Sequence, residues 1–262
     1  YYVSKLVRDS GVKVVQVGEG SDELFCGYEH YYQTLNRYRT YWRYLEMIPS
    51  PAWQLANRML GPVFQISKRR YRQEYLRRLA RGESLFWGGA IAFTESQKED
   101  LLSTTYKSGN GRHASSYPEV EVYLSKINRD KPQADFLERM IYLELKIRLP
   151  ELLLMRVDKI SMSTSVEARV PFLDHKLVEF AMNIPTEVKV RTQAKHILKK
   201  AAEGIIPDNI IYRRKQGFGA PVSEWFRQPE KLGDSLIDVL QNGAIWKRDF
   251  FDYFYWYYCT VP

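Results

Sequence analysis

One stretch near the start of the chain, residues 12–28, constrains the fold more than any other. It reads VKVVQVGEGSDELFCGY, so an apolar β-branched run ends at Gly18 and the carboxylates of Glu19, Asp22 and Glu23 follow at once. In α/β folds, ligands bind at the carboxyl ends of strands. Acidic side chains gathered at such an end indicate a site for a metal-bound nucleotide.

The same stretch also has a purely structural interpretation. Gly-x-Gly is common in strand-to-helix turns, and Ser21 or Asp22 can cap a helix whose first turn contains Glu23. The stretch matches neither the G-x-G-x-x-G pattern nor the Gly-Lys-Ser/Thr of a P-loop. From the residues alone, both interpretations stay open.

The composition is that of a globular protein. The 262 residues suffice for one large domain or two small ones, and the 45% apolar content supports a packed core. No apolar run approaches the ~18 residues of a transmembrane helix, and the first eleven residues lack the apolar core of a signal peptide. Cys26 and Cys259 give neither a disulfide framework nor a metal-binding spacing, and the histidines are scattered. We therefore expect a cytoplasmic protein without a zinc site.

The beginning of the chain predicts that it is part of a longer protein. It has no initiator Met and starts inside an amphipathic helical pattern formed by Tyr2, Val3, Leu6 and Val7. Only Val12–Val17 is predicted as a strand, and residues 103–117 as a mobile surface loop. The rest is predicted to be mostly helical, with helices at 28–48, 51–61, 67–81, 97–103, 119–127, 134–147, 150–162, 175–182, 193–203, 208–212, 230–241 and 247–258.

Much of the net charge of +8 lies in residues 67–81, SKRRYRQEYLRRLAR. Such a cluster can bind nucleic acid or an acidic surface, or dock on a further domain. We favour a solvated helix face with Tyr71, Leu76 and Leu79 directed inward, because no nucleic-acid-binding motif accompanies the cluster.

Three further segments mix charges with apolar residues or glycines. Residues 150–174 either form buried ion pairs or line a site, and structural pairing is favoured because isolated buried charges are costly. Residues 195–200, KHILKK, can hold phosphates, although a solvated face is favoured. Residues 212–221, YRRKQGFGAP, place basic side chains on a glycine-hinged loop that suits an anion clamp.

Taken together, these segments resemble one family. Residues 18–28 resemble the signature of the synthetase domain of glutamine-dependent asparagine synthetase, and residues 155–174, MRVDKISMSTSVEARVPFLD, resemble its second signature. The KHILKKA and RRKQGF segments follow in the family's order and spacing. Residues 50–130 carry no matching motif, and Cys26 stands where the family usually has glycine, which we expect to change packing only.

The resemblance implies an α/β fold of the adenine-nucleotide alpha-hydrolase-like (ATP-pyrophosphatase, HUP/Rossmann-like) type, truncated at its N-terminus. Residues 1–262 would be the C-terminal part of the synthetase domain. In the family, a glutaminase domain that releases ammonia with an N-terminal cysteine, and an SGGxDS pyrophosphate loop, precede this part. Neither is present in the sequence, so the chain alone is expected to be inactive.

The implied activity is that of a ligase dependent on ATP and Mg²⁺. It adenylates the side-chain carboxylate of aspartate and transfers glutamine-derived ammonia, which gives asparagine, AMP and pyrophosphate. The resemblance also allows a homodimer, and it gives no reason to expect a membrane or nucleic-acid partner.

Five residues match functional positions of the family. The backbone of Val17 and Gly18 would approach ATP, and Gly18 lacks a Cβ that would block it. Asp22 matches a Mg²⁺-binding aspartate. Glu19 matches the glutamate needed to form and use the β-aspartyl-adenylate, where it can orient the attacking amine and accept its proton. Lys215 matches a mobile-loop lysine that stabilises the pentavalent phosphorus transition state and the departing pyrophosphate.

Two other functions stay open. The first is an amidotransferase of the same family that acts on a sugar acid of a surface polysaccharide or on another carboxylate. Relatives that form a β-lactam ring carry a different residue at the position of Glu19, so this residue favours an ammonia-using enzyme. The second is a nucleic-acid-binding module that uses residues 67–81.

Overall fold

The computed structural model describes residues 1–66, 70–89, 91–109, 115–191, 193–214 and 221–228, and the single positions 230, 233, 234 and 238. The strands are β1 (Val14–Gln16) and β2 (Glu167–Arg169). The helices are α1 (Tyr2–Asp9), α2 (Ser21–Leu24), α3 (Glu29–Arg37), α4 (Arg43–Met47), α5 (Ser50–Ile66), α6 (Arg70–Arg81), α7 (Glu95–Leu101), α8 (Thr104–Gly109), α9 (Tyr117–Asp130), α10 (Phe136–Leu143), α11 (Met155–Met162), α12 (His175–Met182), α13 (Thr186–Lys189), α14 (His196–Ala202), α15 (Asp208–Ile211) and α16 (Val222–Arg227). The expected helix at 247–258 lies outside the described residues, and so does the expected helix at 230–241 except for four single positions.

The two strands lie far apart in the sequence and pair in parallel. Val14 lies opposite Glu167 and Gln16 opposite Arg169, and the amide of Val17 extends the ladder by donating to the Arg169 carbonyl at 2.8 Å. The predicted strand is thus confirmed. β2 lies where the sequence predicted no strand: its three residues, Glu-Ala-Arg, include no β-branched or aromatic side chain, and they become extended through pairing with β1.

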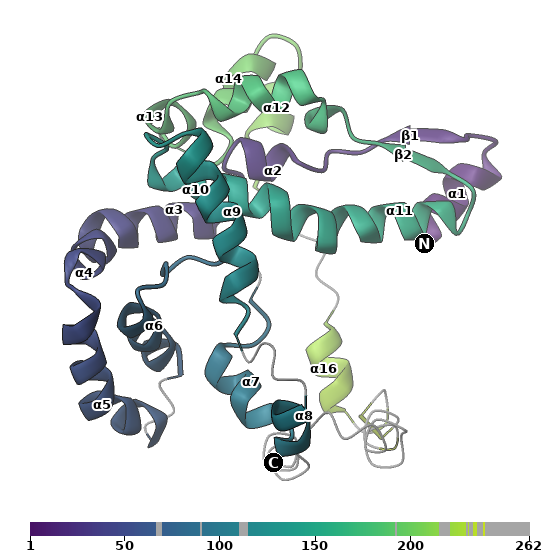
Figure 1. The fold of residues 1–262 in the computed structure, drawn as a ribbon. Coiled ribbons are helices and arrows are strands. Elements are labelled where there is room, and N and C mark those ends of the chain that lie inside the picture. Colours follow the sequence, from purple (N-terminus) through teal and green to yellow (C-terminus); the bar gives the residue numbers. More distant parts are fainter. Residues whose placement is uncertain are drawn as a thin grey trace.

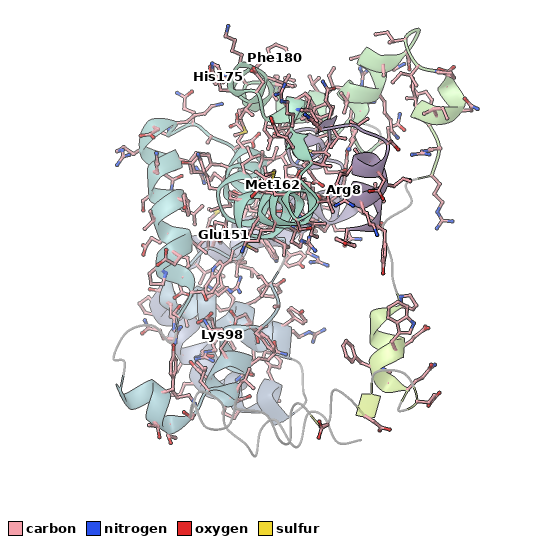
Figure 2. The ribbon with its side chains drawn as sticks, turned by 90° about the vertical axis from the view of Figure 1, so that its right-hand side faces the viewer. Arg8, Lys98, Glu151, Met162, His175 and Phe180 are labelled. Carbon is pink, nitrogen blue, oxygen red and sulfur yellow. The ribbon has the colours of Figure 1, made fainter. Side chains whose placement is uncertain are left out.

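An arm of the molecule consists of the two strands, with α11 running beside them and α1 at the far end (Figure 1). Figure 2 labels Arg8 of α1 and Met162 of α11 close to each other on this arm. The arm leaves apolar side chains uncovered, among them Tyr2, which is 84% exposed, and Met162, which is 52% exposed. Parallel sheets are normally covered on both faces, so this surface is unusual for a finished α/β layer.

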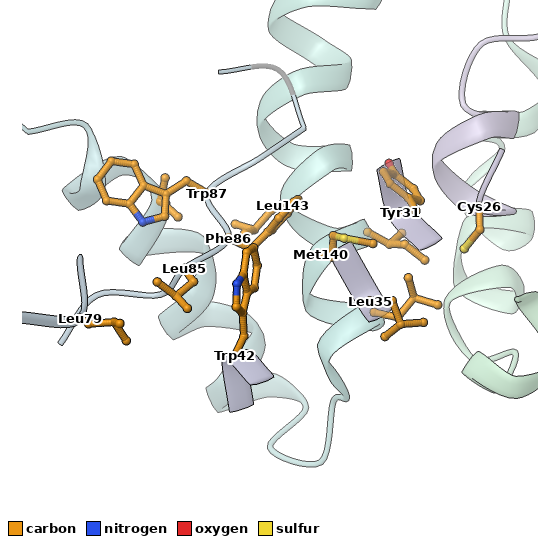
Figure 3. Close-up of a cluster of buried hydrophobic side chains, with 13 residues drawn as sticks. Cys26, Tyr31, Leu35, Trp42, Leu79, Leu85, Phe86, Trp87, Met140 and Leu143 are labelled. Carbon is orange, nitrogen blue, oxygen red and sulfur yellow. The ribbon is translucent and has the colours of Figure 1, made fainter. Parts of the chain in front are cut away.

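A second region, built of helices α3–α10, contains the main hydrophobic core. The core extends from Leu79 and Trp87 on one side to Tyr31 and Cys26 on the other (Figure 3). Cys26 therefore connects this core directly to the stretch that opens the chain. The packing change expected at Cys26 takes the form of a fully buried thiol in a left-handed backbone conformation, φ 54°.

Several helices are longer than the sequence predicted. The interruption expected between 147 and 150 is absent, because residues Glu144–Leu154 form a π-helical segment that joins α10 to α11. Pro150 has no amide hydrogen to donate, and the wider π turn accommodates it without ending the helix. The α-helix α5 also continues past a proline, Pro62, and ends at Ile66. The helix α8 occupies part of the loop that was expected at 103–117.

The basic helix α6 is less solvated than expected. Leu76 and Leu79 point inward as predicted, but Tyr71 is 65% exposed. Arg78 is buried and donates two hydrogen bonds to Glu74, at 2.9 and 2.8 Å, and its guanidinium stacks on Trp87 at 3.7 Å. This arginine is therefore committed to the core and not to an external phosphate backbone.

Among the described residues, no helix combines the length and the apolar character needed to cross a bilayer.

The Glu74–Arg78 pair yields a stability prediction. Replacing Arg78→Met leaves the buried carboxylate of Glu74 without its counter-ion, and should lower the free energy of unfolding by about 3–5 kcal/mol. Urea unfolding of the purified protein measures this loss. The exposed Arg81→Met on the same helix serves as the control, with a change below about 0.5 kcal/mol. Equal losses in both variants would refute the assignment.

Candidate functional site

The signature turn is defined as residues 18–27. It follows β1, contains the short helix α2 and leads to α3. Gly20 caps α2 with φ 87°, and a Cβ at this position would lie 2.3 Å from Cδ2 of Leu173. The hydroxyl of Ser21 donates to the Gly18 carbonyl at 2.7 Å. Glycine is therefore required at position 20 both by the backbone conformation and by the close approach of a second segment.

Asp22 and Lys195 form the electrostatic centre of the turn. Nζ of Lys195 lies 3.1 Å from Oδ1 of Asp22 and donates to Oγ of Ser21 at 2.9 Å. A Cβ at Gly27 would lie 1.8 Å from Asp22 Oδ1 and 2.5 Å from Lys195 Cε. Gly27, the third glycine of the turn, thus makes room for this ion pair.

Lys195 is the residue at this ion pair that sequence reasoning set aside. It belongs to the KHILKK segment, for which a solvated face was favoured, yet it reaches across to the signature turn. Its backbone is left-handed, φ 56°, and its amide donates to the Cys26 carbonyl at 3.4 Å. The solvated interpretation holds for Lys200, which is exposed and pairs with Glu203. The resemblance of the segment to the family motif was the signal that could have singled out Lys195.

The remaining predicted residues of the turn lie beside this ion pair in sequence. Glu19 and Val17 are half-buried, and Gly18 is exposed. A Cβ on Gly18 would meet nothing within 4 Å, so its backbone faces open space, as expected for a position that a ligand approaches. Lys215 lies outside the described residues.

The second signature packs against the first. The ring of Phe172 meets that of Phe25 edge-on, with 6.2 Å between centroids, while Leu173 lies over Gly20. Asp174 then caps α12 by accepting hydrogen bonds from the amides of Lys176 and Leu177. The two motifs, far apart in sequence, therefore form one structural unit.

The charged residues of the second signature do not form the buried ion pairs that were favoured. Arg156, Asp158 and Lys159 are exposed. The pair Glu167–Arg169, at 2.8 Å, has both side chains more than half exposed. The prediction of buried pairing was wrong because the apolar residues between these charges do not enclose them: Ile160 and Met162 are exposed too.

Burial perturbs two titratable groups of the turn. Burial raises the pKa of Glu23, a shift opposed by hydrogen bonds from its backbone surroundings and Tyr28 and by the charge of Arg148. Burial raises the pKa of Cys26 to about 12. A thiol held protonated in this way is a poor nucleophile, which agrees with a packing role.

The described part of the turn does not form a cluster of carboxylates that could surround a magnesium ion. Among the described residues, no group of three or more acidic, histidine or cysteine side chains is placed to hold a metal. Mg²⁺ commonly takes one or two protein carboxylates and completes its shell with water and substrate phosphates. Asp22 fits that pattern as a single ligand, at 22% side-chain exposure.

A cavity of about 500 Å³ lies away from the turn. It is lined by residues of α4, α6, α9 and α10, and none of the residues 17–22 contributes to it. Within the turn, Gly18 is exposed, whereas residues 20, 21 and 23–27 are buried.

Comparison with known proteins gives the family. The asparagine synthase family model matches residues 1–256. The chain is 32% identical over 258 residues to asparagine synthetase [glutamine-hydrolyzing] 1 of Bacillus subtilis (strain 168), a match that covers 95% of this chain and 37% of the relative. It is 44% identical over 97 residues to asparagine synthetase [glutamine-hydrolyzing] 3 of the same organism, covering 34% of this chain and 16% of that protein. It is 27% identical over 272 residues to amidase chry2 of Gibberella zeae, covering 96% of this chain and 38% of that protein.

The chain thus spans less than two-fifths of the length of these curated relatives. No solved structure matches it significantly. Because the family model covers nearly the whole sequence, and because its two signatures meet at one turn in the structure, the chain belongs to the asparagine synthase family.

Proposed function

We propose that this chain forms one wall of an adenylating site in an ATP-dependent amidotransferase that makes asparagine from aspartate. The observation that carries the proposal is that Lys195 contacts Ser21 and Asp22 of the signature turn, and that the second signature borders this turn. A carboxylate and an ammonium held together beside an open glycine backbone suit a phosphate chain with a divalent cation. Membership of the family supplies the reaction class.

The residues of the turn would divide the binding of ATP among them. The open backbone at Val17 and Gly18 lets the nucleotide approach closely. Asp22 would hold Mg²⁺, which when bound neutralises the pyrophosphate and stabilises its charge as it departs. Lys195, already 3.1 Å from Asp22, can turn its remaining N–H groups toward the same phosphates.

The chemical steps would involve two further side chains. The carboxylate of aspartate attacks the α-phosphorus of ATP, which yields the β-aspartyl-adenylate and pyrophosphate. Lys215 would stabilise the charge that develops at phosphorus. Ammonia then attacks the acyl carbon and expels AMP, and Glu19 would orient the amine and accept its proton.

We also propose that residues 1–262 are the C-terminal part of a larger α/β domain of the adenine-nucleotide alpha-hydrolase-like type. The exposed apolar side chains of the arm and its short parallel sheet support this proposal, since such sheets are covered by further strands and helices. The relatives are more than twice as long as the matched segment. Ammonia would then reach the site from a glutaminase domain.

Aspartate is the acceptor that the names of the relatives favour. An exchange assay identifies the acceptor, because adenylation is reversible: labelled pyrophosphate enters ATP only when the correct carboxylate is present. In the full-length protein that carries this chain, aspartate should support exchange, while sugar acids and glutamate should not. Exchange that occurs with a sugar acid but not with aspartate would reassign the substrate. If none of the tested acids supports exchange, the proposal fails.

The first functional prediction concerns the two residues assigned to chemistry. Glu19→Gln and Lys215→Met, each in the full-length protein, should lower kcat for asparagine formation by at least about 10²-fold, since each removes a group aimed at developing charge. Amide formation followed by amino-acid analysis measures the effect. Wild-type turnover in both variants would remove both assignments.

The second prediction concerns the ion pair of the turn. Lys195→Met should lower kcat/KM for ATP by about 10²–10³-fold, as expected for loss of one preorganised cationic donor. Lys200→Met, on the exposed face of the same helix, is the matched control and should change kcat/KM by less than about threefold. Similar values for the two variants would place Lys195 outside the ATP site.

The third prediction concerns the chain by itself. Residues 1–262 should release no AMP or pyrophosphate from ATP and aspartate, because the described residues form only one wall of the proposed site and contain no cluster of metal-ligating side chains. Chromatographic detection of AMP checks this result. Aspartate-dependent AMP formation by the chain alone would show that the site is already complete.

A further inference from the structure

The structure places a buried charged network directly beneath the signature turn. Glu23 is 1% exposed and accepts a hydrogen bond from the Tyr28 hydroxyl at 2.9 Å. The guanidinium of Arg148 stacks on the ring of Tyr28, 4.4 Å from its centroid. Nη1 of the same arginine donates a hydrogen bond to Oε2 of Glu144 at 2.9 Å. The network therefore connects the turn to the π-helical segment by three consecutive contacts.

Glu144 anchors the far end of this network. Its carboxylate is fully buried and accepts hydrogen bonds from the Tyr31 hydroxyl at 3.2 Å and the Gly89 amide at 2.5 Å, besides that of Arg148. A Cβ on Gly89 would lie 2.4 Å from Nε2 of His30 and 3.0 Å from Oε2 of Glu144. Glycine at this position allows the helical region to supply an amide to the carboxylate.

The two buried carboxylates of the network need a nearby cation, and Arg148 supplies it. A buried carboxylate is costly unless hydrogen-bonded and paired. Glu23 and Glu144 are two such groups, and Arg148 is the cation whose charge bears on Glu23 and which contacts Glu144 directly. Nε of Arg148 has no hydrogen-bond partner among the described residues. The position of the guanidinium is thus set by Glu144 on one side and Tyr28 on the other.

We propose that Arg148 is a positioning residue for the signature turn. Held by Glu144, it fixes the ring of Tyr28, which in turn holds Glu23 and with it the turn that carries Glu19 and Asp22. The proposal deepens the proposed function and rests on it for its kinetic readout. It assigns a role to residues outside the two signatures: Tyr31 of α3 and Gly89, which follows α6, hold Glu144 and through it support the site.

The test compares two variants that each remove a single tyrosine hydroxyl. Tyr28→Phe breaks the hydrogen bond to Glu23, whereas Tyr31→Phe breaks one of the three to Glu144 and leaves the Arg148–Tyr28–Glu23 contacts in place. Amide hydrogen exchange across residues 18–27, followed by mass spectrometry, should speed up about tenfold in Tyr28→Phe and less than about twofold in Tyr31→Phe.

A kinetic readout separates positioning from simple loss of fold. Unfolding of part of the sample lowers the apparent kcat but leaves KM unchanged, whereas a displaced turn weakens ATP binding. In the full-length protein, Tyr28→Phe should raise KM for Mg·ATP at least about fivefold at temperatures where both variants are fully folded. Arg148→Met should do the same, Arg148→Lys should recover part of the loss, and the exposed Arg129→Met should behave as wild type.

The outcomes are distinct. Equal exchange rates in the turn for Tyr28→Phe and Tyr31→Phe, together with an unchanged KM, would overturn the proposal. If the wild-type protein supports no ATP–pyrophosphate exchange, the proposed function fails, and the hydrogen-exchange comparison still decides whether Arg148 and Tyr28 position the turn.

Discussion

The parallel pairing of β1 with β2 is the constraint on which the rest of the site depends. It involves three residues on each strand, and each backbone hydrogen bond contributes only about 0.5–1.5 kcal/mol net. The pairing therefore needs the packing that follows it: Leu173 over Gly20 and Phe172 against Phe25. Together these contacts join the two signatures, and Lys195 then reaches the turn from a third segment.

Buried charge serves two purposes in this molecule. The Glu74–Arg78 pair, stacked on Trp87, lies within the helical region and stabilises it. The network around Glu144 and Arg148 lies next to the signature turn. Its proposed role is to hold the turn in position. A hydrophobic replacement of such a network would often be at least as stable, so its presence next to the turn is consistent with a requirement for precise placement.

Local patterns predicted the elements that depend on local chemistry. The β-branched run predicted the strand, and α12 begins at His175, directly after its Asp174 cap, as the pattern indicated. What required tertiary contacts was missed: β2 is extended only because β1 pairs with it, and the helix passes Pro150 only through a π-helical segment. The position of Lys195 beside Asp22 depends on how distant segments pack, which periodicity cannot show. The local pattern located the turn and the resemblance to the family assigned roles to its residues, but neither indicated the network that contacts it.

The most direct measurement follows oxygen from the acceptor. Aspartate labelled with oxygen-18 in its side-chain carboxylate is turned over by the full-length protein with ATP and an ammonia source, and the phosphate-containing products are analysed by mass spectrometry. Adenylation transfers one carboxylate oxygen to phosphorus, so the account predicts AMP that carries one oxygen-18 atom. Label in orthophosphate, or none in AMP while asparagine forms, would contradict an adenylating site.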